Sequence, residues 1–153
     1  MKNISFFSIL AGLLMVSTTS CNNVKSSSKN SKSFTTSGFT SMNIEVIGDV
    51  FYEQSDRFYV NASGSPKLFE ALRVSNNNGK LLIELTNKRS FSGNKKELII
   101  RIGSPKLQAI HFNSVGTFNM EKQFKGEDLE ITNNGVGQIK ISDCHLETFN
   151  LIS

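Results

Sequence analysis

The chain has 153 residues and a formal net charge of +4, from 17 Lys and Arg against 13 Asp and Glu. This length predicts a single domain. The positive charges do not form the dense basic stripe that nucleic-acid binding requires, and the two histidines and two cysteines provide little material for a metal site built on histidine.

Residues 1–20 predict a signal peptide. Lys2 supplies a positive start, and a mainly apolar run from Ile4 to Val16 follows. This run is too short to span a bilayer as a helix, which needs ~20 apolar residues, but it fits the apolar region of a secretory signal peptide. The alternative, a buried amino-terminal helix, is disfavoured because the residues that follow are small and polar.

Cys21 follows the small residues STTS and resembles the cysteine of a bacterial lipobox, where the peptidase cuts before the cysteine and its thiol carries diacylglycerol. Thr18 stands where leucine is usual. Two or three acyl chains anchor a protein stably. We therefore predict lipidation at Cys21 and a lipoprotein of the cell envelope, held in the outer membrane. The alternative is cleavage near Ser20 and a free domain.

Residues 21–38 predict a flexible tether. They are rich in Ser, Asn and Lys and contain one Val and one Phe after Cys21. Such a segment cannot bury enough apolar surface to offset the entropy lost on ordering. We therefore place the start of the ordered domain at Phe39, with the tether separating the domain from the membrane.

From Phe39 onward, apolar and polar residues alternate with the period of β-strands. Only residues 67–74 have helical spacing, enough for one or two turns. The sequence SNNNGK that follows contains an Asn-Gly pair, a signal for a β-hairpin. No window of a dozen residues keeps a helical period, so the fold class is all-β.

Two stretches in the carboxyl-terminal third repeat each other. IHFNSVGTFNM begins at Ile110 and ITNNGVGQIKI begins at Ile131, an offset of 21 residues. The steps at Leu129 and Phe149 extend the repeat with an offset of 20. A period near twenty residues built from short strands is typical of a β-solenoid, or parallel β-helix, in which successive coils stack.

The glycines of this repeat predict corners. Glycine adopts backbone conformations that a Cβ disfavours, so Gly116, Gly135 and Gly137 are expected at stacked corners. Val115 and Val136 are expected to turn inward between the coils. A phosphate-binding role for G-V-G is disfavoured, because no helix follows to direct its amide groups.

Catalytic and metal-binding patterns are weak. His111 and His145 lie far apart in the sequence, and the cluster Asp143–Glu147 alternates between two faces if it is a strand. We therefore predict no metal, no cofactor and a solvent-facing His145. Cys144 is expected to be a small buried hydrophobe, with a reactive thiol as the alternative. The acidic residues form no paired acid–base constellation, so no enzyme is predicted.

Three segments together resemble the auto-transporter adhesin head domains known as GIN domains. They are the segment from Phe39 through MNIEVIGDVFYEQ, the hairpin VSNNNGKLLIEL, and IGSPKLQAIHFNSVG with the glycine corners after it. The resemblance covers residues 39–153. It implies a β-solenoid-like domain on the cell envelope with no established enzymatic activity, and it transfers no functional residue.

The sequence departs from this family in two places. Asn113-Ser114-Val115 replaces the usual G-x-G at the first corner, and the chain reaches Ser153 as a third coil begins, where family members continue. We therefore expect a truncated domain or an open solenoid end, and an open end is a template for association.

The functional prediction is a non-enzymatic binding or adhesion module with envelope proteins or glycans as partners and no nucleic acid. The alternative is a structural or stress-related envelope protein that associates with itself through the open solenoid end. A carbohydrate-active enzyme is supported by fold analogy alone.

Overall fold

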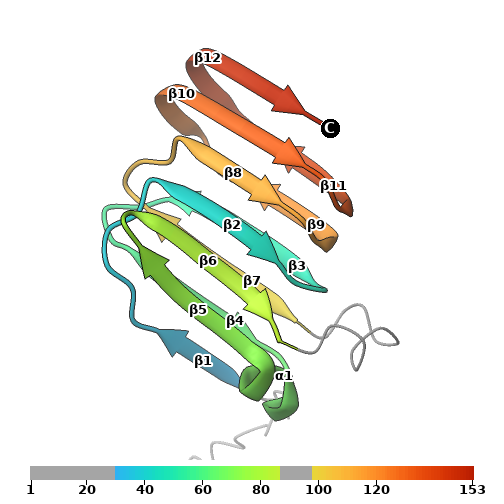
Figure 1. Cartoon of the computed structure of the whole chain (residues 1–153). Helices are drawn as coiled ribbons and strands as arrows, with labels where there is room; N and C mark the ends of the chain where they lie inside the picture. Colours follow the sequence, from blue (N-terminus) through green and yellow to red (C-terminus); the bar gives the residue numbers. More distant parts are fainter. Residues whose placement is uncertain (1–29, 87–97) are drawn as a thin grey trace, which may run out of the picture.

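The computed structural model describes residues 30–86 and 98–153, and these residues form two six-stranded sheets (Figure 1). Sheet A contains, in spatial order, β1 (Ser31–Phe34), β4 (Tyr59–Ser63), β7 (Ile99–Ser104), β3 (Asp49–Gln54), β9 (Val115–Met120) and β11 (Val136–Ile141). Sheet B contains β12 (Cys144–Ile152), β10 (Phe124–Asn133), β8 (Ala109–Phe112), β2 (Ser41–Glu45), β6 (Lys80–Leu85) and β5 (Leu72–Asn77). The one helix of the described residues is α1 (Pro66–Ala71). The all-β prediction is confirmed.

The pairing within the sheets is mixed. Strands β2, β3 and β6 to β12 pair with one another in parallel. Strands β1, β4 and β5, at the opposite end of the molecule from β12, pair antiparallel. The uniform parallel stacking expected from the repeat therefore does not extend to this end, because the hairpin of β5 and β6 and the return strand β4 reverse the chain locally.

The repeat sets the register of the parallel strands. Val136 pairs with Val115 and Gly137 with Gly116, an offset of 21 residues. Ile131 pairs with Ile110 at the same offset, and Phe149 pairs with Leu129 at an offset of 20 residues. The strand pairing predicted from the repeat is therefore confirmed.

The hydrophobic core lies between the two sheets. Each strand of the middle of the stack alternates buried and more exposed residues, as in β2 and β3. The alternation places one face of each strand against the opposite sheet and the other toward solvent. Among the largest fully buried side chains are Phe39, Tyr52, Phe112, Phe118 and Phe124.

The two copies of GSPKL adopt different structures. In the first, Ser65 precedes α1 and Pro66 occupies the first helical turn, where its missing N–H costs nothing. In the second, Ser104 ends β7 and the following residues form an irregular connection to β8. Helical spacing at residues 67–74 therefore predicts the helix correctly but places its end too late, because β5 begins at Leu72.

The predicted hairpin is present. Asn78 and Gly79 both have positive φ, of 51° and 77°, between the antiparallel strands β5 and β6. This is the conformation of a two-residue turn whose twist matches that of the flanking strands, and it explains the Asn-Gly sequence.

Part of the predicted tether belongs to the sheet. Residues Ser31–Phe34 form β1, which pairs antiparallel with β4 at the edge of sheet A. The prediction of a flexible tether is wrong for these residues, because backbone pairing and the contact of Phe34 with the core stabilise a strand despite its polar composition. The predicted signal peptide, Cys21 and the first part of the tether lie outside the described residues.

The repeat glycines stack where the chain passes from sheet B to sheet A. Gly116 is the second residue of β9, has a φ of 142°, and approaches Gly48 so closely that an added Cβ would lie 2.0 Å from the Gly48 carbonyl oxygen. Gly137, in the next coil, would place a Cβ 2.5 Å from the Gly116 carbonyl oxygen. Gly135 lies in the bend before β11, and its N–H donates to Asn133 Oδ1. These positions require glycine because backbone meets backbone.

The expected inward orientation of Val136 is wrong. Its side chain is 83% exposed. Ile139 and Ile141 of the same strand pack against the core, and successive side chains of a strand point to opposite faces. Val136 therefore points outward, and the inward position beside it belongs to Gly137.

Candidate functional site

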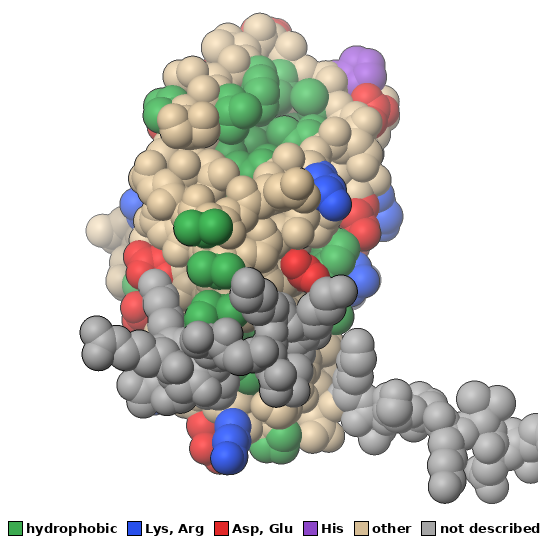
Figure 2. Space-filling view, turned by 90° about the vertical axis from the view of Figure 1, so that its right-hand side faces the viewer, with side chains coloured by type: hydrophobic (Ala, Val, Ile, Leu, Met, Phe, Trp, Pro, Cys, Tyr) green, Lys and Arg blue, Asp and Glu red, His purple; other side chains and the backbone are tan. Residues whose placement is uncertain are grey.

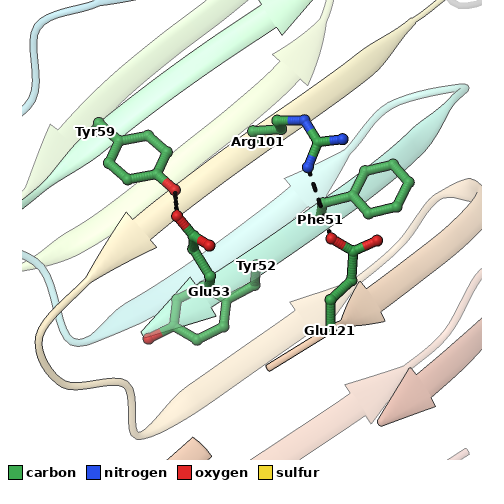
Figure 3. A pocket seen from close by; sticks show the side chains of 6 residues that line it. All are labelled: Phe51, Tyr52, Glu53, Tyr59, Arg101 and Glu121. Carbon is green, nitrogen blue, oxygen red and sulfur yellow. Dashed lines mark hydrogen bonds and ion pairs between the residues drawn. The ribbon is translucent and has the colours of Figure 1, made fainter. Parts of the chain in front are cut away.

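A small pocket lies on the outer face of sheet A (Figure 3). It has a volume of about 50 Å³ and is lined by Phe51, Tyr52, Glu53, Tyr59, Arg101 and Glu121. Residues of β3, β4 and β7 alternate between core and solvent, so the neighbours of buried Val50, Val60 and Ile100 point outward here. These strands, together with Glu121 directly after β9, place two aromatic rings, two carboxylates and a guanidinium group in one region of the surface.

Cross-strand register brings Tyr59 to Glu53. Glu53 pairs with Gly103, and Gly103 pairs in turn with Tyr59. Because Gly103 has no side chain, the Tyr59 ring lies across its backbone, where a Cβ would be 2.1 Å from the ring. The Tyr59 hydroxyl consequently reaches Glu53 and donates a hydrogen bond to its Oε1 at 2.5 Å.

The guanidinium group of Arg101 lies over the second aromatic ring, that of Phe51. Arg101 pairs with Phe51 across β7 and β3, and its guanidinium carbon lies 4.7 Å from the centre of the Phe51 ring. The Nη1 atom of Arg101 is 3.6 Å from Glu121 Oε2 (Figure 3). A cation over an aromatic face is stabilised by the ring quadrupole, so the Phe51 ring and the Glu121 carboxylate both favour this position of the exposed Arg101 side chain.

Hydrogen bonding and burial set the protonation states of Glu53 and Tyr59. The hydrogen bond from Lys122, followed by that from Tyr59, holds the pKa of Glu53 below its ordinary value. Burial, followed by the hydrogen bond to Glu53, raises the pKa of Tyr59 to about 12. At neutral pH Glu53 is therefore a carboxylate, and Tyr59 keeps the proton that it donates.

Tyr52 lies beneath the pocket and faces the core. Its hydroxyl is 3.0 Å from Ser104 Oγ, and its ring packs edge-on against Phe124. Burial raises the pKa of Tyr52 to about 12, although the hydrogen bond with Ser104 opposes this shift.

These two tyrosines are the only ones in the chain, which also has no tryptophan. We therefore expect the tyrosinate absorbance at 295 nm to rise near pH 12 in the folded protein and near pH 10 in urea. Because the folded pKa values are raised, their contribution to stability is complete below pH 10 and is lost as the pH rises toward 12. A rise near pH 10 while the circular dichroism remains native would contradict these environments. In Tyr59→Phe, the remaining rise should stay near pH 12, because Tyr52 is unchanged.

A second depression lies on the outer face of sheet B. It is shallow, with a volume of about 380 Å³, and is lined by Gln108, Ala109, Asp128, Leu129, Glu130, Thr148 and Asn150. It contains no aromatic and no basic side chain, so it offers fewer kinds of contact than the pocket on sheet A. The pocket on sheet A is therefore the candidate site.

The residues singled out from the sequence lie elsewhere. His145 is exposed, as predicted, with Nδ1 3.7 Å from Asp143 Oδ1 and 3.3 Å from Gln123 Nε2. Cys144 is exposed, so its predicted burial is wrong. It pairs with buried Phe124, but β12 is the last strand of sheet B and nothing described covers it. Within residues 30–86 and 98–153, no three His, Cys, Asp or Glu side chains gather as a metal site would require.

The described part of the chain contains no helix long and apolar enough to cross a membrane.

Sequence reasoning did not identify the pocket residues. The available signal was strand alternation, because Val50 and Tyr52 mark the inward face of β3 and so assign Phe51 and Glu53 to the outward face. An outward phenylalanine beside an outward carboxylate is a recognisable departure from a plain solvated face.

The family model described as "Putative auto-transporter adhesin, head GIN domain" matches residues 38–152. The chain belongs to this GIN domain family. The resemblance inferred from the sequence is thereby confirmed, including its start close to Phe39. No curated protein is similar enough in sequence to match.

Several solved structures share the fold of this GIN domain. A "putative adhesin" from Bacteroides fragilis NCTC 9343 has a TM-score of 0.74 at 22% identity, over 80% of this chain and 56% of that chain. A "putative lipid binding protein" from Parabacteroides distasonis ATCC 8503 has a TM-score of 0.60 at 20% identity, over 80% of this chain and 61% of the other. A "putative adhesin" from Parabacteroides merdae ATCC 43184 has a TM-score of 0.58 at 18% identity, over 76% of this chain and 51% of that chain.

At these identities the similarity shows the fold. The GIN domain described here spans between about half and three fifths of the length of these solved chains.

Proposed function

We propose that this GIN domain is a non-enzymatic binding module of the cell envelope and that it binds saccharide chains on the outer face of sheet A. The observation that carries the proposal is the pocket in which Phe51 and Tyr59 lie beside Glu53, Arg101 and Glu121. The family and the structural neighbours support a binding or adhesion role.

The chemistry of the pocket suits a sugar. A pyranose ring has an apolar C–H face and a rim of hydroxyl groups, so it needs both a flat apolar surface and hydrogen-bonding groups beside it. Aromatic rings supply the apolar surface with little conformational freedom to lose. Carboxylates accept hydrogen bonds from hydroxyl groups, and a guanidinium donates to them.

The interactions of the charged groups in the pocket favour binding over covalent chemistry. Glu53 is engaged by Lys122 and Tyr59, and Arg101 is engaged by Glu121. The lowered pKa of Glu53 is the opposite of what a general acid at neutral pH requires. These features support binding over catalysis.

A glycan array probed with the whole chain tests the proposal. The wild type is expected to retain a set of saccharides, and Phe51→Ala and Arg101→Ala are each expected to weaken that binding at least about tenfold, ~1.4 kcal/mol. His111→Ala is the matched control, because His111 lies on β8 between buried Ile110 and Phe112 and so faces outward from sheet B. Equal retention by all variants, or no retention by the wild type, would refute saccharide binding at this pocket.

Anchoring is the second part of the proposal. The apolar run of residues 4–16 and the lipobox-like position of Cys21 support export and lipidation, and we propose that the lipid anchor holds the domain in the outer membrane. Cys21→Ala is expected to move the protein from the membrane fraction to the soluble fraction, because the acyl anchor is lost. A variant that stays in the membrane with unchanged electrophoretic mobility would contradict the anchor.

The third part of the proposal concerns architecture. The strands from β8 to β12 repeat at offsets of 20 to 21 residues and alternate between the two sheets, which supports describing them as successive coils of a β-solenoid.

A further inference from the structure

One row of outward side chains crosses sheet A at right angles to its strands. Residues that are paired in register lie beside one another on the same face of a sheet. Arg101 pairs with Phe51 on one side and with Asn61 on the other. Asn119 lies beyond Phe51, and Ser33 lies beyond Asn61. We call these five residues, in the spatial order Ser33, Asn61, Arg101, Phe51 and Asn119, the outward row.

Two asparagines of the outward row flank the residues of the pocket. Asn61 and Asn119 each lie between buried residues of their strands, so both side chains point outward. Asn61 is exposed, and Asn119 Nδ2 donates a long hydrogen bond, of 3.4 Å, to the Val50 carbonyl. A side-chain amide has an acceptor oxygen and two donor hydrogens, so it pairs with a hydroxyl group in either direction. Hydrogen-bonding groups suited to sugars therefore continue on both sides of the pocket.

The dimensions of this surface suit the middle of a saccharide chain better than its end. Neighbouring strands lie ~4.8 Å apart, so the outward row, which crosses five strands, spans ~19 Å. A single sugar ring is far shorter, and several consecutive sugars are needed to reach both asparagines. The pocket itself has a volume of about 50 Å³, whereas pockets that enclose a small molecule measure ~300–1,000 Å³. It is too small to enclose a terminal sugar, but a chain can lie across it and continue in both directions.

The charges around the outward row favour a neutral chain. The charged side chains that point outward from β3 and β7, or directly follow β9, are Asp49, Glu53, Glu121, Arg101 and Lys122. Both basic groups already contact a carboxylate, Arg101 that of Glu121 and Lys122 that of Glu53. On the face seen in Figure 2, the acidic and basic side chains of the described residues also lie close together, with no extended region of one sign.

A saccharide that carries carboxylates would compete with Glu53 and Glu121 for these two basic groups. It would also meet the acidic side chains that remain, and like charges at close range repel. A saccharide without charge meets neither cost, because its hydroxyl groups pair with amides and carboxylates alike.

We infer, on the basis of the saccharide binding proposed above for the sheet A pocket, that the outward row binds the interior of a neutral, extended polysaccharide whose chain lies across the strands. Phe51 supports one sugar ring at the centre. Asn61 and Asn119 bind hydroxyl groups of the sugars on either side, and Ser33 binds those of a further sugar. The strands present these groups at a regular interval, which suits a polymer whose units also repeat.

Calorimetric titration of the whole chain with oligosaccharides of increasing length tests the inference. The probes are oligomers of glucose, of mannose and of N-acetylglucosamine, each from two to six units, with galacturonate oligomers as the acidic series. At least one neutral series is expected to bind about tenfold tighter as the hexamer than as the dimer, because the flanking amides add hydrogen bonds. The galacturonate oligomers are expected to bind more weakly than this neutral hexamer.

Asn61→Ala and Asn119→Ala are each expected to weaken binding of that hexamer about threefold to tenfold and to leave binding of its dimer unchanged, since each removes a hydrogen bond outside the pocket. Asn77→Ala is the matched control, because Asn77 is an exposed asparagine of β5 in sheet B. It is expected to bind both oligomers as the wild type does.

Equal affinity for dimer and hexamer, tighter binding of the galacturonate oligomers, or a hexamer affinity that is unchanged in both Asn61→Ala and Asn119→Ala would each overturn the inference. In each of these cases, a loss of binding in Phe51→Ala would still support the proposed saccharide site. If the whole chain binds none of the neutral or acidic series, both the polysaccharide inference and saccharide binding at the pocket are refuted.

Discussion

Gly116→Ala is expected to destabilise the domain by at least about 3 kcal/mol in urea unfolding. The φ of 142° already disfavours a side chain, at ~1–3 kcal/mol. In addition, the new Cβ would lie 2.0 Å from the carbonyl oxygen of Gly48, which belongs to the backbone of the neighbouring coil and cannot rotate away. The coils would have to separate locally, and this adds the cost of disrupted packing.

Gly79→Ala separates the two causes. Gly79 also has a positive φ, of 77°, but nothing lies within 4 Å of its added Cβ. The loss of stability in Gly79→Ala should therefore reflect backbone strain alone, at ~1–2 kcal/mol. If Gly116→Ala and Gly79→Ala unfold at the same urea concentration, the close contact between Gly48 and Gly116 does not exist in solution.

Ser114→Ala is expected to cost about 1–3 kcal/mol, although it removes a single oxygen. The Ser114 side chain is 1% exposed, and its hydroxyl joins two coils. Its Oγ accepts a hydrogen bond from the Val46 N–H and donates one to the Ile44 carbonyl, both at 2.9 Å. Removing it leaves the buried Val46 N–H without this partner.

Ser142→Ala is the matched control for the buried serine. Ser142 is exposed, so its substitution should change the free energy of unfolding by no more than ~0.5 kcal/mol. If Ser114→Ala lowers the free energy of unfolding no more than Ser142→Ala does, water must replace the Ser114 hydroxyl at the corner.

Ser114 also explains why the first corner departs from the G-x-G pattern. In the 21-residue repeat, Ser114 takes the position of Gly135 one coil earlier. A side chain does not fit at Gly135 itself, because a Cβ there would lie 2.2 Å from the Ser114 carbonyl oxygen. Ser114 fits its own position by hydrogen bonding to the backbone of the preceding coil.

The parts of the fold that repeat could be predicted from the sequence. Two aligned copies determine a register, so the pairing of Gly116 with Gly137 followed from the offset alone. The Asn-Gly hairpin could also be predicted from the sequence, because a two-residue turn with positive φ has a local sequence signature. Both features depend on residues near one another in sequence or on copies of one pattern.

The parts that depend on single, distant pairings could not be predicted. Strand β1 has a polar sequence and forms because β4 offers a free edge. The pocket requires the register of β3, β7 and β4, which joins Glu53, Gly103 and Tyr59 in one row although no repeat relates them. The predicted burial of Cys144 also failed, since its partner Phe124 faces inward but no strand lies beyond β12 among the described residues.

The most direct test of the proposed binding face is an NMR titration of the ¹⁵N-labelled chain with a saccharide retained on the array. We expect amide shift changes that concentrate on Phe51, Tyr59 and Arg101, on the outer face of sheet A. The amides of Asn43 and His111, on the outer face of sheet B, should remain unchanged. Shifts confined to sheet B, or no shifts at saturating saccharide, would contradict saccharide binding at the sheet A pocket.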